Sequence, residues 1–335
     1  MDSATFRLAS SVVLRIDGDR GAVSHFVREY EPCAVAKDGP LDVEVTFGRG
    51  AAALDSGSAV EGGHKTVRWR VALGAPHDVP LVATISLGGW PASFALSLVQ
   101  GYFVEPLISI AAVRRGLVLL PSVAIVADEG LLLIMGRSRA GKSTLAARAM
   151  AAGRSVPGDD QAFVDPAGRC WPFPRRLRFY PYIAETAPAA HARLGRATRR
   201  ELAVRRSVAT LTRGYVRPSL AVDGTELGGT WHPEPLPIRR IVLVERSSES
   251  DVLLVEPADR EAAVAWAAEL LGEQRARLGR AGGDWFAALD GTWGLERAVL
   301  NEGFATSPVE RISVPRRWDA STAVDAIARY LRLEG

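Results

Sequence analysis

The stretch LLLIMGRSRAGKSTLAARAM, residues 131–150, joins an apolar run, a glycine-containing loop and a helix-forming segment. Leu131 to Met135 is a continuous apolar run typical of a buried central strand. Ser143 to Ala152 contains strong helix formers, with Gly153 just past its end. Gly136 to Ser143, between them, matches the pattern G-x-x-x-x-G-K-[ST]. A strand, this loop and a helix in that order predict a phosphate-binding loop in an α/β fold.

The chemistry of phosphate binding assigns a role to each part of the loop. Glycines let backbone N–H groups turn toward phosphate oxygens, and the following helix adds the positive end of its dipole. Lys142 is expected to bridge the β- and γ-phosphates, and the Ser143 hydroxyl to bind Mg²⁺. Arg137 and Arg139 add two cations, which either strengthen nucleotide binding or face solvent or a partner. The residues expected to contact ATP are Gly136, Ser138, Arg139, Ala140, Gly141, Lys142, Ser143 and Thr144.

An acidic pair, Asp159-Asp160, follows Gly158 shortly after the predicted helix. In phosphate-loop folds an acidic residue at the end of a neighbouring strand holds Mg²⁺. Adjacent residues of an extended chain point to opposite faces, so one carboxylate can face the metal and the other the phosphoryl acceptor, as a general base. The alternative is a turn in which the aspartates bond to their own backbone.

The run from Gly136 to Phe163 resembles the nucleotide site of HPr kinase/phosphorylase and its bacterial relatives, a site shared with phosphoenolpyruvate carboxykinases. The similarity lies in the phosphate loop, in the short helix ended by Gly153 and in the acidic pair at the same spacing. Arg139 stands where the family has a second loop glycine. The resemblance extends over residues 117–175 and implies a PEP-carboxykinase/HPr-kinase-like P-loop core.

The same resemblance implies an ATP- and Mg²⁺-dependent kinase that phosphorylates a serine of a peptide or protein. It implies Asp159 as the general base and Asp160 near the metal, beside Ser143. The related stand-alone proteins include kinases of ribosomally made peptides such as lasso-peptide precursors, so a precursor of that type is one expected acceptor.

A kinase also needs a cation on the transferring phosphoryl group. Arg175, Arg176 and Arg178 follow the acidic pair, and Arg176 is the candidate chosen from the sequence. The alternative is a solvated basic loop.

Composition narrows the class of protein. The chain has 335 residues and a net charge of +3, which is too weak a field to indicate a nucleic-acid partner. Cys33 and Cys170 form no CxxC motif, and the five histidines show no metal-ligand spacing. The apolar stretch from Ala92 to Val113 is interrupted by polar residues and is interpreted as a buried helix. We expect a cytoplasmic protein without a membrane partner. The sequence leaves open whether the protein forms a homo-oligomer.

The order of predicted elements divides the chain into an N-terminal α+β sub-domain, residues 1–90, and a kinase domain, residues 91–335. A loop is predicted at Ala51–Gly63 and a helix at Ala189–Val204. The strands predicted in the sub-domain, around a helix at Gly21–Tyr30, are Ser10–Ile16, Asp42–Phe47, Thr66–Leu73 and Leu81–Leu87.

Three functions are compatible with these motifs. The first is a phosphotransferase acting on a serine of a peptide or protein. The second is a nucleotide-binding regulatory ATPase that uses ATP as a switch. The third is a small-molecule kinase, or a carboxykinase-like enzyme, with the same site. The carboxykinase version is weakened because that family needs further lysine and histidine metal ligands, and this chain has three lysines, Lys37, Lys65 and Lys142.

Overall fold

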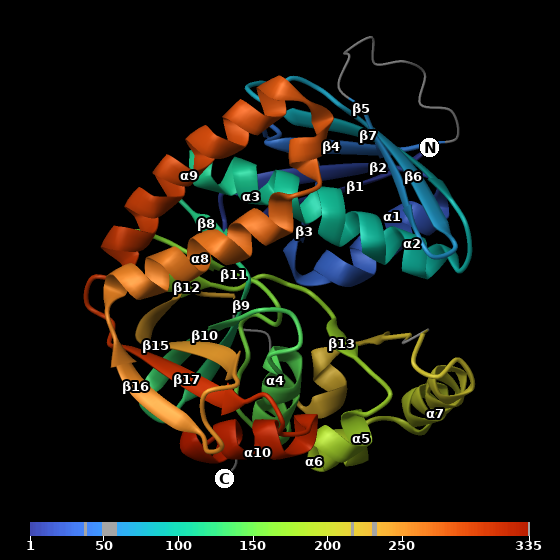
Figure 1. Ribbon diagram of the computed structural model, residues 1–335. Coiled ribbons are helices and arrows are strands. Elements are labelled where there is room, and N and C mark those ends of the chain that lie inside the picture. Colours follow the sequence, from blue (N-terminus) through green and yellow to red (C-terminus); the bar gives the residue numbers. More distant parts are fainter. Residues whose placement is uncertain (37–38, 49–58, 216–217, 230–232, 334–335) are drawn as a thin grey trace. The chain divides into compact units, whose positions relative to one another are not determined.

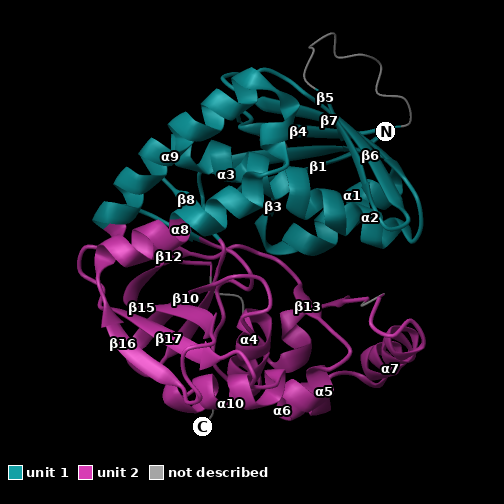
Figure 2. Cartoon of the chain, in the orientation of Figure 1, with its two compact units in different colours: residues 1–120, 163–166, 268–302 teal, residues 121–162, 167–267, 303–335 magenta. Residues whose placement is uncertain are grey.

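The computed structural model describes the chain except residues 37–38, 49–58, 216–217, 230–232 and 334–335 (Figure 1). The protein is a mixed α/β protein with two mixed sheets, 41% helix and 30% strand, which confirms the predicted α/β class. The chain forms two compact units, coloured separately in Figure 2. Unit 1 contains residues 1–120, 163–166 and 268–302, and unit 2 contains residues 121–162, 167–267 and 303–335.

Unit 1 is built on a sheet whose described strands run in the order β3-β1-β2-β4-β7-β6-β5. The strands β2, β4 and β7 run parallel, and the outer pairs are antiparallel. The strands are β1 (Asp2–Leu8), β2 (Val12–Gly18), β3 (Ala34–Val35), β4 (Val43–Phe47), β5 (Ala59–His64), β6 (Val67–Leu73) and β7 (Leu81–Gly88). Its helices are α1 (Arg20–Tyr30), η1 (Glu31–Cys33), α2 (Ala92–Val99), η2 (Gln100–Val104), α3 (Glu105–Arg114), η4 (Leu278–Ala281) and most of α9 (Gly283–Gly303).

One helical stretch of unit 1, Ala92–Arg114, is long and apolar enough to cross a membrane, with a mean hydropathy of 1.5. However, 78% of its apolar window is buried inside the protein. It consists of α2, the π-helical turn η2 and α3 in direct succession. The prediction of a buried helix at Ala92–Val113 is therefore confirmed.

Unit 2 contains the predicted phosphate loop and is built on parallel strands. The strands β10, β15 and β17 run parallel, and β9 and β16 flank them antiparallel. The strands are β9 (Ser122–Ala127), β10 (Gly130–Gly136), β12 (Arg169–Trp171), β13 (Leu177–Phe179), β14 (Leu220–Val222), β15 (Leu236–Ser247), β16 (Leu254–Ala258) and β17 (Val309–Pro315). The helices are α4 (Lys142–Ala151), α5 (Ile183–Thr186), α6 (Pro188–Arg193), α7 (Arg196–Leu211), η3 (Gly224–Leu227), the first half of α8 (Arg260–Arg275), whose second half belongs to unit 1, and α10 (Ala320–Tyr330).

Two short strands lie where the chain passes between the units: β8 (Val118–Leu120) ends the first segment of unit 1, and β11 (Ala162–Val164) begins in unit 2.

The parallel strands bring their carboxyl ends to one edge of the unit 2 sheet. Gly136, the last residue of β10, lies opposite Val244 of β15, which lies opposite Ile312 of β17. The loop that leaves β10 therefore starts at the edge where ligands bind in open α/β sheets. Leu145 and Ala146 of α4 are fully buried in the core of this unit, so packing fixes the helix that follows the loop.

Several sequence-based predictions were wrong in detail. The predicted loop at 51–63 contains strand β5 from residue 59 on, and its first residues lie outside the described part of the chain. Only Val60 of this glycine-rich strand is buried, so it carries no apolar alternation. Strand β1 was not expected either. The single helix predicted at 189–204 is two helices, α6 and α7, which break at Leu194-Gly195.

The compact units do not coincide with a division at residue 90. Unit 1 continues to Leu120 and also contains residues from the C-terminal part of the chain. The sub-domain of residues 1–90 as an independent folding unit stays a prediction.

Candidate phosphate-binding site

The loop from Gly136 to Gly141 makes a compact turn that has little space for side chains. A Cβ atom on Gly136 would lie 2.8 Å from the Cβ of Ala140 and 3.1 Å from the carbonyl oxygen of Val244. Gly141 has φ +94° and directly precedes α4, and no side chain caps that end of the helix. The first N–H groups of α4 therefore remain available to an anion, as the sequence predicted for a phosphate loop.

Arg139 adopts φ +70°, the left-handed region in which glycine is favoured. This conformation costs a non-glycine residue roughly 1–2 kcal/mol. Arg139 thus has the backbone conformation of a glycine, the residue that the resembled family has at this position, and its side chain is exposed. Arg137 is also exposed, and its guanidinium carbon lies 5.8 Å from the ring centroid of Trp266.

Lys142 is buried at the base of the loop, with 8% of its surface exposed. Its ammonium group donates to the carbonyl oxygen of Gly136 and, at 3.2 Å, to that of Arg137. The positive charge of Lys142 therefore lies against the loop in which it is expected to bind phosphate. Ser143 and Thr144 follow in the first turn of α4, and Ser138 is exposed at the tip of the loop.

The acidic pair lies beside the loop because its segment runs along β9. The Ser122 N–H donates to the Asp160 carbonyl oxygen at 3.1 Å. Ser122 is in turn paired with Met135, the residue before the loop. The backbone of Asp160 is thus two strand spacings, roughly 10 Å, from the end of β10. The predicted proximity of loop and acidic pair is present in the structure.

Gly158 and Asp160 shape this segment into a tight turn. A Cβ atom on Gly158 would lie 2.4 Å from the carbonyl oxygen of Gln161, so only glycine fits there. Asp160 has φ +71°, which aspartate tolerates better than most residues. The segment therefore turns sharply, but the contacts seen for the two aspartate side chains are with Arg175 and Ser143, not with the backbone of the turn.

Asp159 is 5% exposed and shares a hydrogen bond with the Ser143 hydroxyl, while its Oδ1 atom is buried without a hydrogen-bond partner. Burial and the adjacent Asp160 carboxylate raise the pKa of Asp159 to about 7. The Ser143 hydrogen bond and the charges of Arg175 and Lys142 act in the opposite direction. A carboxyl group that titrates near neutrality can accept or hold a proton at physiological pH.

Asp160 has a different environment: its side chain is 46% exposed and pairs with Arg175 at 2.9 Å. Burial opposes its ionisation, but the charges of Arg175, Lys142 and Arg178 outweigh that effect and hold the pKa of this carboxyl below its usual value. Two neighbouring carboxyl groups with oppositely shifted pKa values are suited to different tasks. Asp160 is the ionised member.

The arginine chosen from the sequence is not the one that contacts the acidic pair. Gly158 and Phe173 form a parallel bridge, and two residues further along each chain this pairing brings Asp160 opposite Arg175. Arg176, the next residue, donates instead to the carbonyl oxygen of Ala221 at 2.8 Å. Successive residues of an extended segment point to opposite sides, so the Gly158–Phe173 bridge places Arg175, and not Arg176, next to Asp160.

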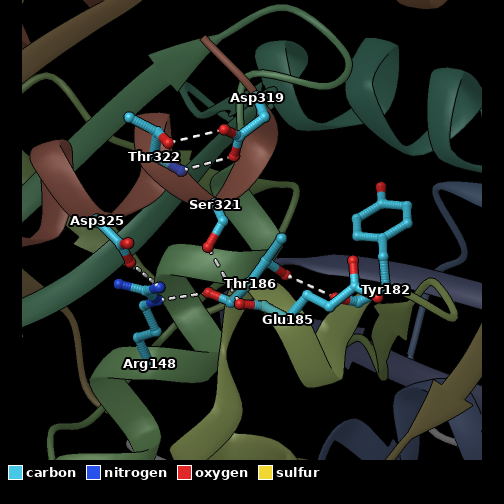
Figure 3. A network of polar contacts seen from close by, with 8 residues as sticks. All are labelled: Arg148, Tyr182, Glu185, Thr186, Asp319, Ser321, Thr322 and Asp325. Carbon is cyan, nitrogen blue, oxygen red and sulfur yellow. Dashed lines mark hydrogen bonds and ion pairs between the residues drawn. The ribbon is translucent and has the colours of Figure 1, made fainter.

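A polar network fixes the far end of the phosphate-loop helix (Figure 3). Arg148 of α4 is 6% exposed, donates to the carbonyl oxygen of Thr186 at 2.6 Å and pairs with Asp325 of α10. Ser321 of α10 donates to the carbonyl oxygen of Glu185 at 3.1 Å. The helices α4, α5 and α10 are therefore held together. Helix α10 also lies close to the loop, since Val324 leaves so little space at Gly141 that an added Cβ atom would be 3.0 Å from the Val324 side chain.

The donor set fits Mg²⁺ with a nucleotide. The Ser143 hydroxyl, the unpartnered Asp159 Oδ1 atom and the ionised Asp160 carboxylate are hard oxygen donors, which Mg²⁺ prefers. No cluster of three His, Cys, Asp or Glu side chains that could hold a metal by themselves occurs among the described residues.

Comparison with known proteins finds no family model and no curated protein that matches this sequence.

The elevated pKa of Asp159 predicts a specific pH dependence of stability. Between about pH 4 and pH 7 the folded protein keeps a proton that the unfolded chain releases, so the free energy of unfolding should fall as the pH rises through this window. Asp159→Asn should remove a decline of up to about 1.4 kcal/mol per pH unit. Chemical denaturation at a series of pH values, without nucleotide, measures it.

The control is Glu249→Gln, which neutralises an exposed carboxylate in the same unit and should keep the wild-type decline. The same pH dependence in the wild type and in Asp159→Asn between pH 4 and pH 7 would contradict the elevated pKa.

Proposed function

We propose that this protein is an ATP- and Mg²⁺-dependent phosphotransferase that phosphorylates a serine of a peptide or protein, with a nucleotide site of the HPr kinase and phosphoenolpyruvate carboxykinase type. The observation that carries the proposal is the contact between the phosphate loop and the acidic pair. Asp159, with a pKa near 7, shares a hydrogen bond with Ser143 of the loop. A base of that pKa beside a phosphate site is what transfer to a hydroxyl group requires.

The loop and Lys142 would hold the polyphosphate. The uncapped N–H groups at the start of α4 favour an anion, and the Lys142 ammonium group would exchange the Gly136 and Arg137 carbonyls for phosphate oxygens. Ser143 and Asp160 would hold Mg²⁺, which supplies positive charge to the phosphates. Arg175, two residues into the segment after Phe173, lies where it can offset charge on the transferring group.

Asp159 would accept the proton of the acceptor serine. The serine oxygen forms a bond to the γ-phosphorus while the bond from that phosphorus to the bridging oxygen breaks, and ADP leaves with the electron pair. The serine proton passes to Asp159. Asp160 cannot serve equally well, because its depressed pKa makes it the weaker base.

The test of this function is incubation with labelled ATP, Mg²⁺ and serine-containing peptides, followed by mass spectrometry for an added phosphoryl group. We expect transfer by the wild type and none by Lys142→Ala, because the lost charge acts most strongly on the transition state. The control Lys65→Asn removes an exposed lysine with φ +55°, a conformation that asparagine tolerates, and should keep full activity.

Undiminished transfer by Lys142→Ala would remove the phosphate-loop assignment. ATP hydrolysis without any acceptor would favour the regulatory ATPase, and transfer to metabolites alone would favour a small-molecule kinase.

The division of roles within the acidic pair has its own test. Asp159→Asn keeps the size of the side chain but loses the base, so transfer should fall by ~10²–10⁴-fold with little change in Mg-ATP affinity. Asp160→Asn and Ser143→Ala should instead weaken Mg-ATP binding, because each loses an oxygen donor. Titration calorimetry and single-turnover kinetics separate the two effects. Loss of ATP binding in Asp159→Asn would reverse the assignment, and unchanged turnover would reduce the pair to a turn.

The neighbouring arginines form a matched pair of variants. Arg175→Ala should lower the rate of transfer by about 10²-fold or more, since Arg175 is the arginine paired with Asp160. Arg176→Ala should change it by less than about tenfold, because that side chain bonds to the Ala221 carbonyl. Rates under saturating ATP decide between them. The opposite order would favour Arg176, the residue chosen from the sequence.

A further inference from the structure

Helix α7 of unit 2 exposes an apolar face that the proposed chemistry does not use. Val204, Val208 and Leu211 are 64, 38 and 83% exposed, and Ala197, two turns before Val204, is exposed as well. These four residues recur at helical spacing and form one line, which we call the α7 stripe. Most surface helices turn such a stripe toward the core.

The α7 stripe cannot be turned inward, because the opposite side of the helix is already attached. Leu202, roughly 160° around the helix from Val204, is 2% exposed in the core of unit 2. Arg205 donates to the Ser219 carbonyl oxygen at 2.6 Å, and Thr198 donates to the Glu226 carboxylate at 2.8 Å. The stripe is therefore a fixed outward surface of this unit.

The charges beside the stripe are positive. Arg205 is paired with Glu201, and Arg206 with Glu185. Arg196 and Arg200 lie on one flank of the stripe, and among the described residues neither has a hydrogen-bond or ion-pair partner. An apolar line flanked by two uncompensated arginines is complementary to an amphipathic segment with acidic flanks.

The position of α7 in the chain connects it to the site. The helix belongs to the segment between β13 and β14, and these strands pair with each other. Strand β13 begins two residues after Arg175, which contacts Asp160. The Arg176 bond to Ala221 of β14 attaches the end of the same segment. The segment that carries α7 thus begins just after Arg175 and Arg176, and its end is bonded to Arg176.

We propose that α7 is the docking surface for an acidic amphipathic helical segment of the peptide or protein acceptor, separate from the serine that is phosphorylated; this inference rests on the proposed function. A second copy of the chain fits less well, because its own α7 would set arginines against arginines. An anionic membrane also fits less well. Membrane-surface helices insert bulky Trp, Phe or Leu side chains, whereas the α7 stripe contains one alanine, two valines and one leucine, and the acidic Glu201 lies between Ala197 and Val204.

Docking is measured by fluorescence anisotropy on the full chain without nucleotide. The probe is a labelled synthetic helix of about six turns with leucine along one face and glutamate on both flanks; a second probe has lysine in place of glutamate. We expect saturable binding of the glutamate probe that weakens with salt, and little binding of the lysine probe. Val204→Asp and Leu211→Asp should each weaken it at least about tenfold, and Arg200→Ala about threefold.

Matched controls come from the same unit. Val252→Asp changes a valine that is 59% exposed outside α7, and Arg329→Ala removes an exposed arginine of α10; both should bind the probe as the wild type does. Equal binding of both probes, no binding, or binding insensitive to the α7 variants would overturn the proposal. So would binding of vesicles containing anionic lipid in preference to the probe, or a dimer that Leu211→Asp dissociates.

A second measurement separates this inference from the proposed function. The glutamate probe is extended by a flexible linker and one serine, and phosphorylation is followed with labelled ATP. We expect the α7 variants to raise KM at least about tenfold with kcat unchanged, and Lys142→Ala to bind the probe normally without transferring phosphate. Binding without any phosphorylation would refute the kinase and leave docking standing, whereas phosphorylation with an unchanged KM in the α7 variants would refute docking alone.

Discussion

The hydrogen bond between Ser143 and Asp159 joins two parts of unit 2 that the chain builds separately. Ser143 belongs to the first turn of α4, which packs into the core, and Asp159 belongs to the turn that runs along β9. The Asp159 carboxyl group is buried, and burial together with the adjacent Asp160 carboxylate raises its pKa to about 7, while the bond from Ser143 acts in the opposite direction. The chemistry proposed for the site depends on this burial, because the same carboxyl group in water would titrate like a surface aspartate.

The backbone around the acidic pair is constrained by two separate pairings. On one side Ser122 and Ala124 of β9 bond to its carbonyl groups, and on the other the Gly158–Phe173 bridge places Arg175 beside Asp160. The glycine at 158 has no substitute, because a Cβ there would overlap the Gln161 carbonyl. Strain is accepted at Arg139 and Asp160, which both have positive φ, and such strain is commonly found at functional sites.

The strand β10, the loop after it, the helix α4 and the proximity of the acidic pair could be predicted because they depend on local sequence. The loop motif, the apolar run of β10 and the terminal Gly153 are each a signal within a few residues. Arg175 could not be separated from Arg176 in this way, since the choice depends on a parallel bridge to a residue 15 positions away. Strand β5 was missed for a related reason: its partner β6 holds it in the sheet although only one of its own residues is buried.

The charge balance of the site sets a condition on the proposed reaction. In the free protein the charges of Lys142 and Arg175 favour ionisation of both carboxylates, and the charge of Arg178 favours ionisation of Asp160. A polyphosphate would draw these cations toward its own oxygens, and its negative charge would raise the pKa of Asp159 further, so that the base would be protonated when it is needed. A divalent cation held by Ser143 and Asp160 restores positive charge next to Asp159. Under the proposed function, a divalent cation is therefore what would let Asp159 accept a proton while the polyphosphate is bound.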